Sequence, residues 1–140
     1  MSTILKGHGR CEGIFEGPAI VSGQPFGFWQ GIDPYTGVVI DKRHDLKGQS
    51  VTNKAFIYPF GRGSTGTPGI FLEAVRNHNA PGAIVNIKSE PMIMVCALLA
   101  EVFFGVKIPV VDGLSTNEFE MIKKSRYVKI NGGTGILEIE

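Results

Sequence analysis

The sequence predicts one α/β domain over residues 1–140, in which parallel and antiparallel strands combine with two to three helices. Three observations support this fold class. Short apolar segments alternate with glycine and proline turns along the chain, which is typical of short strands. The middle of the chain alternates strand and helix patterns, which favours a parallel sheet. The chain ends in two strand patterns joined by a glycine turn, which favours an antiparallel hairpin.

The first half is expected to hold strands separated by tight turns and polar loops. Proline and glycine are placed to reverse the chain between apolar segments. In chain order the expected elements are a strand at 17–22, a strand or loop at 26–30, a turn at 33–37, a buried strand at 38–40, a loop at 45–53 and a strand at 54–58.

The second half is expected to alternate strands with helices whose ends are well marked. Thr67 can cap a first helix and Pro68 suits its first turn, while Ser115 and Glu118 match a capping box. The second helix is apolar nearly all round and is therefore expected to be buried. In chain order the expected elements are a helix from 67 that ends by 77–82, a strand at 83–87, a helix from 89 to 104, a strand at 108–111, a helix from 115 to 123 and a hairpin of 127–130 with 135–139.

Composition and charge exclude several classes of function. The 14 Lys and Arg against 13 Asp and Glu give a net charge of +1, without the basic surplus of a dedicated nucleic-acid binder. The longest apolar run, residues 92–106, is interrupted by Glu101 and is too short to span a bilayer. The N-terminus has no apolar signal core. We therefore expect a cytoplasmic protein that binds neither nucleic acid nor a membrane.

Cysteine and histidine residues do not form a metal-binding pattern. Cys11 and Cys96 lie far apart, whereas a self-contained zinc or iron–sulfur site needs about four ligands. Cys96 lies in an apolar run and is expected to be a buried, inert thiol. His8 near a mobile N-terminus, His44 in a charged loop and His78 at a helix end are expected to be solvated. We therefore expect no metal ligand in this chain, and reduced thiols fit the cytoplasm.

The segment richest in chemistry is PFGRGSTGTPG, residues 59–69. Its glycines allow close approach to a ligand, and it lies between a strand end and a helix start, where backbone N–H groups favour anions. Arg62 adds donors suited to carboxylate or phosphate, and Ser64 and Thr65 add hydroxyls. The segment lacks the GK[ST] of a phosphate-binding P-loop, and its match to GxGxxG is weak evidence by itself. The alternative is a glycine-rich turn with an exposed arginine.

A second unusual stretch spans residues 23–33 and holds three aromatic side chains within four residues. It forms either core packing around Trp29 or the wall of a site or partner surface. Asp41 and Asp112 directly follow apolar strand patterns, where site carboxylates also occur, although structural roles are favoured for both.

The chain resembles the small subunit of the aconitase X family. The resemblance is carried by SGQPFGFWQGIDPYTGVVIDKRHDLKGQSVTNKAFIYPFGRGST, NAPGAIVNIKSEP and IPVVD. It is clearest from Gly17 to Asp112 and covers nearly the whole chain. It implies a swivelling β/β/α domain, like the mobile domain of aconitases.

The resemblance also implies a role and a partner for the glycine-rich segment. Ser64 would be the catalytic proton acceptor, and Arg62, Gly63 and Thr65 would bind the substrate. A large subunit would complete a heterodimer and ligate an iron–sulfur cluster, expected as 4Fe-4S. After Thr65 the chain departs from the family pattern, which leaves substrate contacts beyond that residue unassigned.

The function implied by the resemblance is a hydro-lyase subunit that is active only with its large subunit. It would dehydrate a phosphorylated hydroxy acid, (R)-5-phosphomevalonate, to trans-anhydromevalonate 5-phosphate in isoprenoid synthesis. Three alternatives stay open: the small subunit of a cis-3-hydroxy-L-proline dehydratase, a non-catalytic module that binds a small molecule, and a phosphohistidine carrier. The carrier is the weakest alternative, because no histidine lies in the glycine-rich segment.

Overall fold

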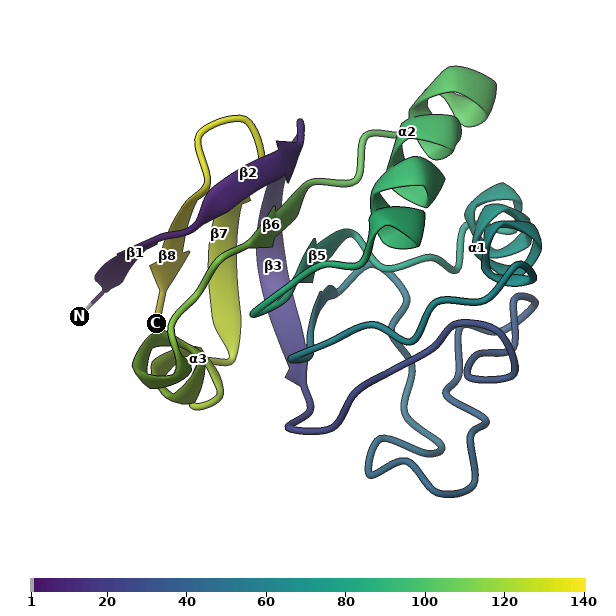
Figure 1. Ribbon diagram of the computed structural model, residues 1–140, viewed down its shortest axis with the longest axis horizontal. Coiled ribbons are helices and arrows are strands. Elements are labelled where there is room, and N and C mark those ends of the chain that lie inside the picture. The colour runs from purple at the N-terminus through teal and green to yellow at the C-terminus, as the bar shows by residue number, and fades with distance from the viewer. Residues whose placement is uncertain (1) are drawn as a thin grey trace.

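The computed structural model describes residues 2–140, which form eight strands and three helices (Figure 1). The strands are β1 (Thr3–Lys6), β2 (His8–Cys11), β3 (Ile14–Val21), β4 (Ala55–Ile57), β5 (Ala83–Val85), β6 (Val110–Asp112), β7 (Tyr127–Asn131) and β8 (Ile136–Ile139). The helices are α1 (Thr67–Arg76), α2 (Pro91–Phe104) and α3 (Thr116–Ile122). The expected mixed α/β class is confirmed.

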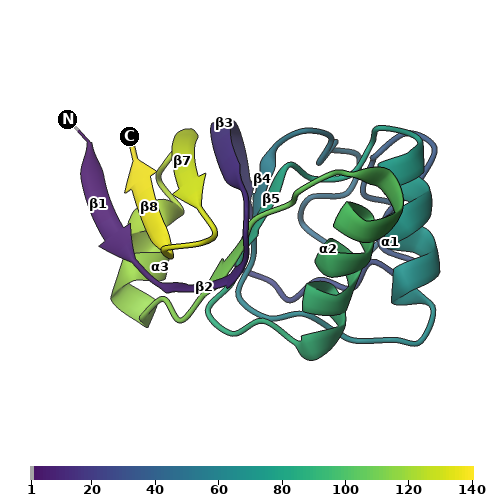
Figure 2. The ribbon, with the colours of Figure 1, turned by 90° about the horizontal axis from the view of Figure 1, so that it is seen from above.

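All eight strands join one sheet in the order β1-β8-β7-β3-β4-β5-β6-β2. Neighbours from β3 to β6 run parallel, and the remaining neighbours run antiparallel. A single residue, Gly7, separates β1 from β2, so residues 3–11 pair with β8 at one edge and with β6 at the other. Figure 2 shows these two strands as one bent segment. The N-terminal segment therefore closes the sheet into a barrel.

Glycines make this closure sterically possible. A Cβ on Gly9 would overlap the carbonyl oxygen of Gly132, and a Cβ on Gly135 would overlap that of Gly7. Gly135 also has a φ of +80°, which L side chains rarely adopt. The Gly7 N–H donates to the Gly135 carbonyl at 2.9 Å. The bent N-terminal segment and the β7–β8 turn therefore touch backbone to backbone.

Side chains of the strands alternate between two hydrophobic cores. In β4, Ala55 and Ile57 face the barrel interior, whereas Phe56 faces the outer layer. Phe119 and Ile122 of α3 pack into the inner core. Helices α1 and α2 lie side by side at the opposite end of the molecule (Figures 1 and 2) and pack with residues 22–54 against the outer face.

Two predictions about strands were wrong. The N-terminal strands β1 and β2 were not expected, because their pairing partners lie at least 99 residues away and nothing local indicates them. Residues 38–40 were expected to form a buried strand, but Val38 and Val39 make only isolated bridges to Ser50 and Ile32. They belong to the long connection of residues 22–54, which folds over the outer core.

Two predictions about helices were also wrong. Helix α2 buries Cys96 as expected, but its Leu98, Val102 and Phe103 side chains are about 60% exposed, because the helix lies in an outer layer and packs on one side only. Thr67 does not cap α1: Gly66 is the N-cap, and the buried Thr67 hydroxyl has no hydrogen-bond partner within residues 2–140. No helix formed by these residues combines the length and apolar character needed to cross a bilayer.

We predict that Gly9→Ala destabilises the protein by about 1–3 kcal/mol, because the added methyl overlaps rigid backbone at the barrel closure. The matched control is Gly69→Ala, in the first turn of α1, where an added Cβ has no atom within 4 Å apart from its chain neighbours and its own helix backbone. This control should stabilise the protein by about 0.5–1 kcal/mol, since alanine favours a helix over glycine. Urea unfolding measures both, and a Gly9→Ala chain as stable as the wild type would contradict the closure argument.

Candidate active site

The glycine-rich segment emerges where the parallel strands end. It follows β4 and leads into α1, while residues 86–90 follow the neighbouring β5. A parallel bridge joins Phe60 to Lys88, and the Ile87 N–H donates to the Pro59 carbonyl at 3.0 Å. The carboxyl ends of parallel strands are where α/β proteins usually bind ligands. The topology therefore places the segment at a favourable position for a site.

The glycines of this segment permit close packing against two side chains of the same protein. A Cβ on Gly61 would lie 2.6 Å from Cγ of Glu90, and one on Gly63 would lie 2.9 Å from its Oε2. A Cβ on Gly66 would overlap the indole of Trp29. The sequence predicted close approach to a ligand, whereas the structure shows close approach to Glu90 and Trp29. Glu90 is itself fixed, because its carboxylate caps α2 through the Met92 N–H at 2.9 Å.

A pocket of about 300 Å³ opens beside this segment. It brings together residues from the connection after β3 and from the glycine-rich segment: Gly27, Trp29, Gln30, Asp41, Arg62, Gly63 and Ser64. Thr65 is exposed and does not line this pocket. Three of the four expected site residues therefore share one pocket. The aromatic stretch divides between its two alternatives: Phe26 and Phe28 are buried in the core, whereas the half-exposed Trp29 lines the pocket.

Ser64 lies just before the N-terminus of α1. Its Oγ accepts a hydrogen bond from the Gly66 N–H at 3.3 Å, and its carbonyl accepts one from the Thr67 N–H at 3.0 Å. The N-terminal end of a helix carries partial positive charge and stabilises a nearby anion. Within residues 2–140 no histidine or carboxylate accepts a hydrogen bond from this hydroxyl. The positive groups beside it are the N-terminus of α1 and Arg62, which lines the same pocket.

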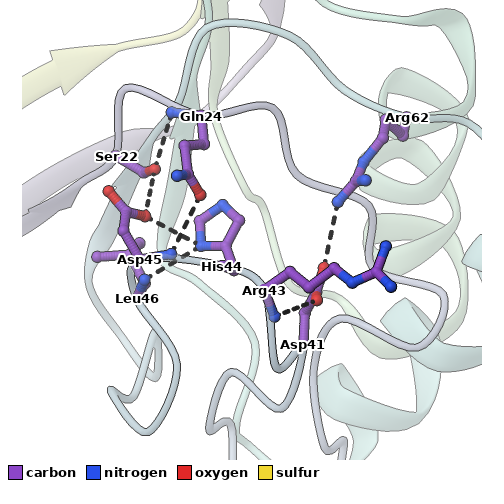
Figure 3. A network of polar contacts seen from close by, with 8 residues as sticks. All are labelled: Ser22, Gln24, Asp41, Arg43, His44, Asp45, Leu46 and Arg62. Atoms are coloured by element: carbon purple, nitrogen blue, oxygen red, sulfur yellow. Dashed lines mark hydrogen bonds and ion pairs between the residues drawn. The ribbon is translucent and has the colours of Figure 1, made fainter.

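Arg62 and Asp41 form an ion pair on the pocket wall (Figure 3). The Arg62 Nη2 lies 3.3 Å from Asp41 Oδ2, and the Arg43 backbone N–H donates to Asp41 Oδ1 at 3.0 Å. The Arg43 N–H and the Arg62 guanidinium lower the pKa of Asp41 below its usual value. The sequence favoured a structural role for Asp41. Its place in the pocket depends on the fold of residues 22–54, and its position after an apolar segment was the only local signal.

Gln30 belongs to the 23–33 stretch that the sequence offered as a possible site wall, but it was not predicted individually as a site residue. It lines the pocket beside Trp29 and has a φ of +61°, a conformation that residues other than glycine seldom adopt. Strained backbone of this kind is concentrated at functional sites. No local sequence pattern predicts the positive φ of Gln30.

The prediction that His44 is solvated was wrong. Its side chain is buried, Phe26 packs against it edge to face with ring centroids 5.3 Å apart, and its Nδ1 accepts the Leu46 N–H at 3.2 Å. Nδ1 also lies 3.2 Å from the Asp45 carboxylate, which accepts the Ser22 hydroxyl at 2.7 Å (Figure 3). His44 thus anchors the connection that carries Asp41. His8 and His78 are exposed, as expected.

Asp112 has the structural role that the sequence favoured. Its buried carboxylate accepts the Arg10 Nε–H at 2.7 Å and the Ser89 backbone N–H at 3.0 Å. The Ser89 hydroxyl donates to Asn86 at 3.0 Å, and the Asn86 amide donates to the Tyr58 carbonyl at 2.8 Å. This buried chain ties β2 to the connection after β5 and thereby supports the base of the site.

The described residues do not provide a ligand set for an iron–sulfur cluster. Among residues 2–140 no three His, Cys, Asp or Glu side chains gather in a metal-binding group. Burial raises the pKa of Cys96 to about 12 and also raises the pKa of the half-buried Cys11 thiol. Burial therefore disfavours the thiolate form of both cysteines.

Comparison with known proteins connects this architecture to a family. The aconitase X swivel domain matches residues 4–139. A protein of Methanocella arvoryzae named phosphomevalonate dehydratase small subunit is 40% identical over 96% of this chain and 98% of its own length. A Hypocrea jecorina protein named cis-3-hydroxy-L-proline dehydratase is 37% identical over 92% of this chain, which corresponds to 22% of that longer protein.

A solved structure agrees with these relatives. The crystal structure of Thermococcus kodakaraensis aconitase X in its holo-form contains a chain that superposes with a TM-score of 0.84 at 31% identity. The match covers 99% of this chain and 98% of that one. The match extends through the barrel, the outer helices and the glycine-rich segment, so the chain belongs to the aconitase X swivel-domain family.

Proposed function

We propose that this chain is the small subunit of a hydro-lyase that converts (R)-5-phosphomevalonate to trans-anhydromevalonate 5-phosphate in isoprenoid synthesis. The relatives named phosphomevalonate dehydratase small subunit, matched over nearly their whole length, support this substrate. The observation that carries the proposal is the pocket at the carboxyl ends of the parallel strands, which both Ser64 and Arg62 line.

Ser64 is the proton acceptor in this proposal. Dehydration removes a proton from one carbon and a hydroxide from its neighbour, while the electrons of the broken C–H bond form the new double bond. A serine alkoxide can take that proton only where positive potential stabilises it. The α1 N-terminus, the Gly66 N–H and Arg62 supply this potential. Ser64 Oγ then holds the proton that the substrate loses.

Arg62 and Gly63 bind the substrate in the pocket, and the role of Thr65 as a third contact rests on the family resemblance alone. The Arg62 guanidinium presents a planar set of donors that suits carboxylate or phosphate. The Gly63 backbone lines the pocket, and the exposed Thr65 hydroxyl lies next to Ser64 in the chain, outside the pocket lining.

A large subunit completes the site in a cytoplasmic heterodimer. Three observations support such a partner: the relatives are named small subunits, the described residues lack cluster ligands, and apolar side chains of α2 are exposed, as is typical of interaction surfaces. The large subunit carries the 4Fe-4S cluster, which supplies Lewis-acid chemistry when bound. Nucleic acid and membrane are not expected partners.

A second candidate function follows from the Hypocrea jecorina relative. Its name supports cis-3-hydroxy-L-proline as the substrate, and its 37% identity to this chain is within the range of the phosphomevalonate relatives. The candidate differs in charge, because hydroxyproline lacks a phosphate. A direct assay with each substrate therefore distinguishes the two candidate functions.

We predict that Ser64→Ala lowers kcat of the complex by about 10²–10⁴-fold, the range for a lost general base. The matched control is Ser50→Ala, because Ser50 Oγ accepts the N–H two residues ahead, from Thr52, at 3.2 Å, and does not line the pocket. The control should retain wild-type kcat. Anaerobic assay of the reconstituted complex measures both, and turnover by Ser64→Ala at the control rate would exclude its proposed role.

We also predict that the complex with the large subunit dehydrates 5-phosphomevalonate and leaves cis-3-hydroxy-L-proline unchanged. Anaerobic reconstitution, followed by product analysis with each substrate, measures this selectivity. Turnover of hydroxyproline alone would select the second candidate, and a stable complex without either activity would reject both substrates.

A further inference from the structure

We propose that Asp41 is a positioning residue that holds the Arg62 guanidinium at the pocket, so that the remaining donors of Arg62 meet the anionic end of the substrate. The inference deepens the proposed function and rests on it, because it assigns a task to a carboxylate within the same pocket. Nothing in the resemblance or in the relatives' names assigns this residue a role.

The Asp41 carboxylate is preset by its own backbone turn. Oδ1 accepts the Arg43 N–H at 3.0 Å, which leaves Oδ2 to accept from Arg62 at 3.3 Å (Figure 3). The His44 N–H donates to the Asp41 carbonyl at 3.1 Å, and the His44 and Leu46 side chains are buried. Asp41 therefore belongs to a turn whose following residues, His44 and Leu46, are packed in the interior.

The Arg62 backbone is fixed, because its N–H donates to the Phe26 carbonyl at 2.9 Å, but its side chain is not buried. Arg62 lies between Gly61 and Gly63, its side chain is 60% exposed, and within residues 2–140 that side chain pairs with Asp41. A long, exposed side chain with glycine neighbours retains many rotamers, and restricting them before binding improves affinity. Since one ion pair at an exposed site adds little stability, positioning is the better explanation for Asp41.

The geometry leaves Arg62 free to bind an anion. The guanidinium has five N–H donors, and the contact with Asp41 involves a single nitrogen, Nη2. The other donors can form paired hydrogen bonds to a carboxylate or phosphate. The lowered pKa of Asp41 keeps its carboxylate charged at neutral pH, so the anchor persists under working conditions.

Other carboxylates near the site are already engaged. Glu90 caps α2 behind the glycine-rich segment, and Asp45 accepts the Ser22 hydroxyl and lies beside His44. Among residues 2–140, Asp41 is the one carboxylate that lines the pocket. It is therefore the acidic side chain suited to orient Arg62 there.

The main experiment measures steady-state kinetics of Asp41→Asn in the reconstituted complex. Asparagine keeps an oxygen for the Arg43 N–H but loses the charge, so KM should rise about tenfold through lost preorganisation while kcat stays within about threefold. The matched control is Asp33→Asn, because Asp33 caps a similar turn by accepting the Tyr35 N–H at 2.9 Å and does not line the pocket. The control should keep the wild-type KM.

A double-variant comparison separates positioning from a general structural effect. If Asp41 acts through Arg62, then Asp41→Asn combined with Arg62→Lys should have the KM of Arg62→Lys alone, within about twofold. Asp41→Glu, which restores a carboxylate, should recover part of the lost affinity. Independent, multiplying effects of the two substitutions, or an unchanged KM in Asp41→Asn, would overturn the proposal.

A binding measurement tests Asp41 without turnover. Trp29 is the single tryptophan of the chain and lines the pocket, so its fluorescence in the full chain reports a titration with inorganic phosphate. Asp41→Asn should weaken phosphate binding at least fivefold, because the Arg62 guanidinium is no longer preorganised, whereas Asp33→Asn should not weaken it.

Equal binding by Asp41→Asn and wild type, or no binding by wild type, would overturn the proposal. Absence of 5-phosphomevalonate turnover in the wild-type complex would instead reject the proposed function, and the phosphate titration would still decide the role of Asp41.

Discussion

Closure of the barrel by residues 3–11 is the constraint on which the rest of the structure depends. This segment pairs with β8 at one end of the strand order and with β6 at the other, so it links the two ends of the sheet. Glycines at positions 9 and 132 allow the backbones to meet. The closed barrel positions β4, β5 and β6 side by side, and it thereby positions the connections that follow their carboxyl ends.

The inner core stabilises the barrel, whereas the outer core positions the pocket wall. The inner core fills the barrel with aliphatic side chains and is closed by α3. The outer core holds aromatic rings, with Phe26 against Phe28 and Phe56 at centroid distances of 5.0 and 4.8 Å. This aromatic cluster fixes the connection of residues 22–54, which has little regular secondary structure. The pocket wall formed by Trp29 and Asp41 therefore depends on packing in the outer layer.

The pocket contains the groups that the proposed function assigns to this chain. A hydroxyl, an arginine and helix dipoles face an open pocket, whereas the described part of the chain has no cluster ligands. This division fits the proposed heterodimer, in which proton transfer belongs to this chain and assistance to the leaving hydroxyl belongs to its partner. The polar contacts from Arg10 through Asp112 to Ser89 join β2 to the connection after β5, beside the glycine-rich segment.

The sequence by itself determined the features that depend on neighbouring residues. The capping box at Ser115, the closing hairpin and the start of α1 near Pro68 follow from local hydrogen bonding and turn chemistry, and the glycine-rich segment was evident from composition. Only the tertiary structure decided the N-terminal strands, the burial of His44, the exposed face of α2 and the place of Asp41 in the pocket. Each of these depends on contacts between segments far apart in the chain, and local patterns carry no information about which distant segment will meet them.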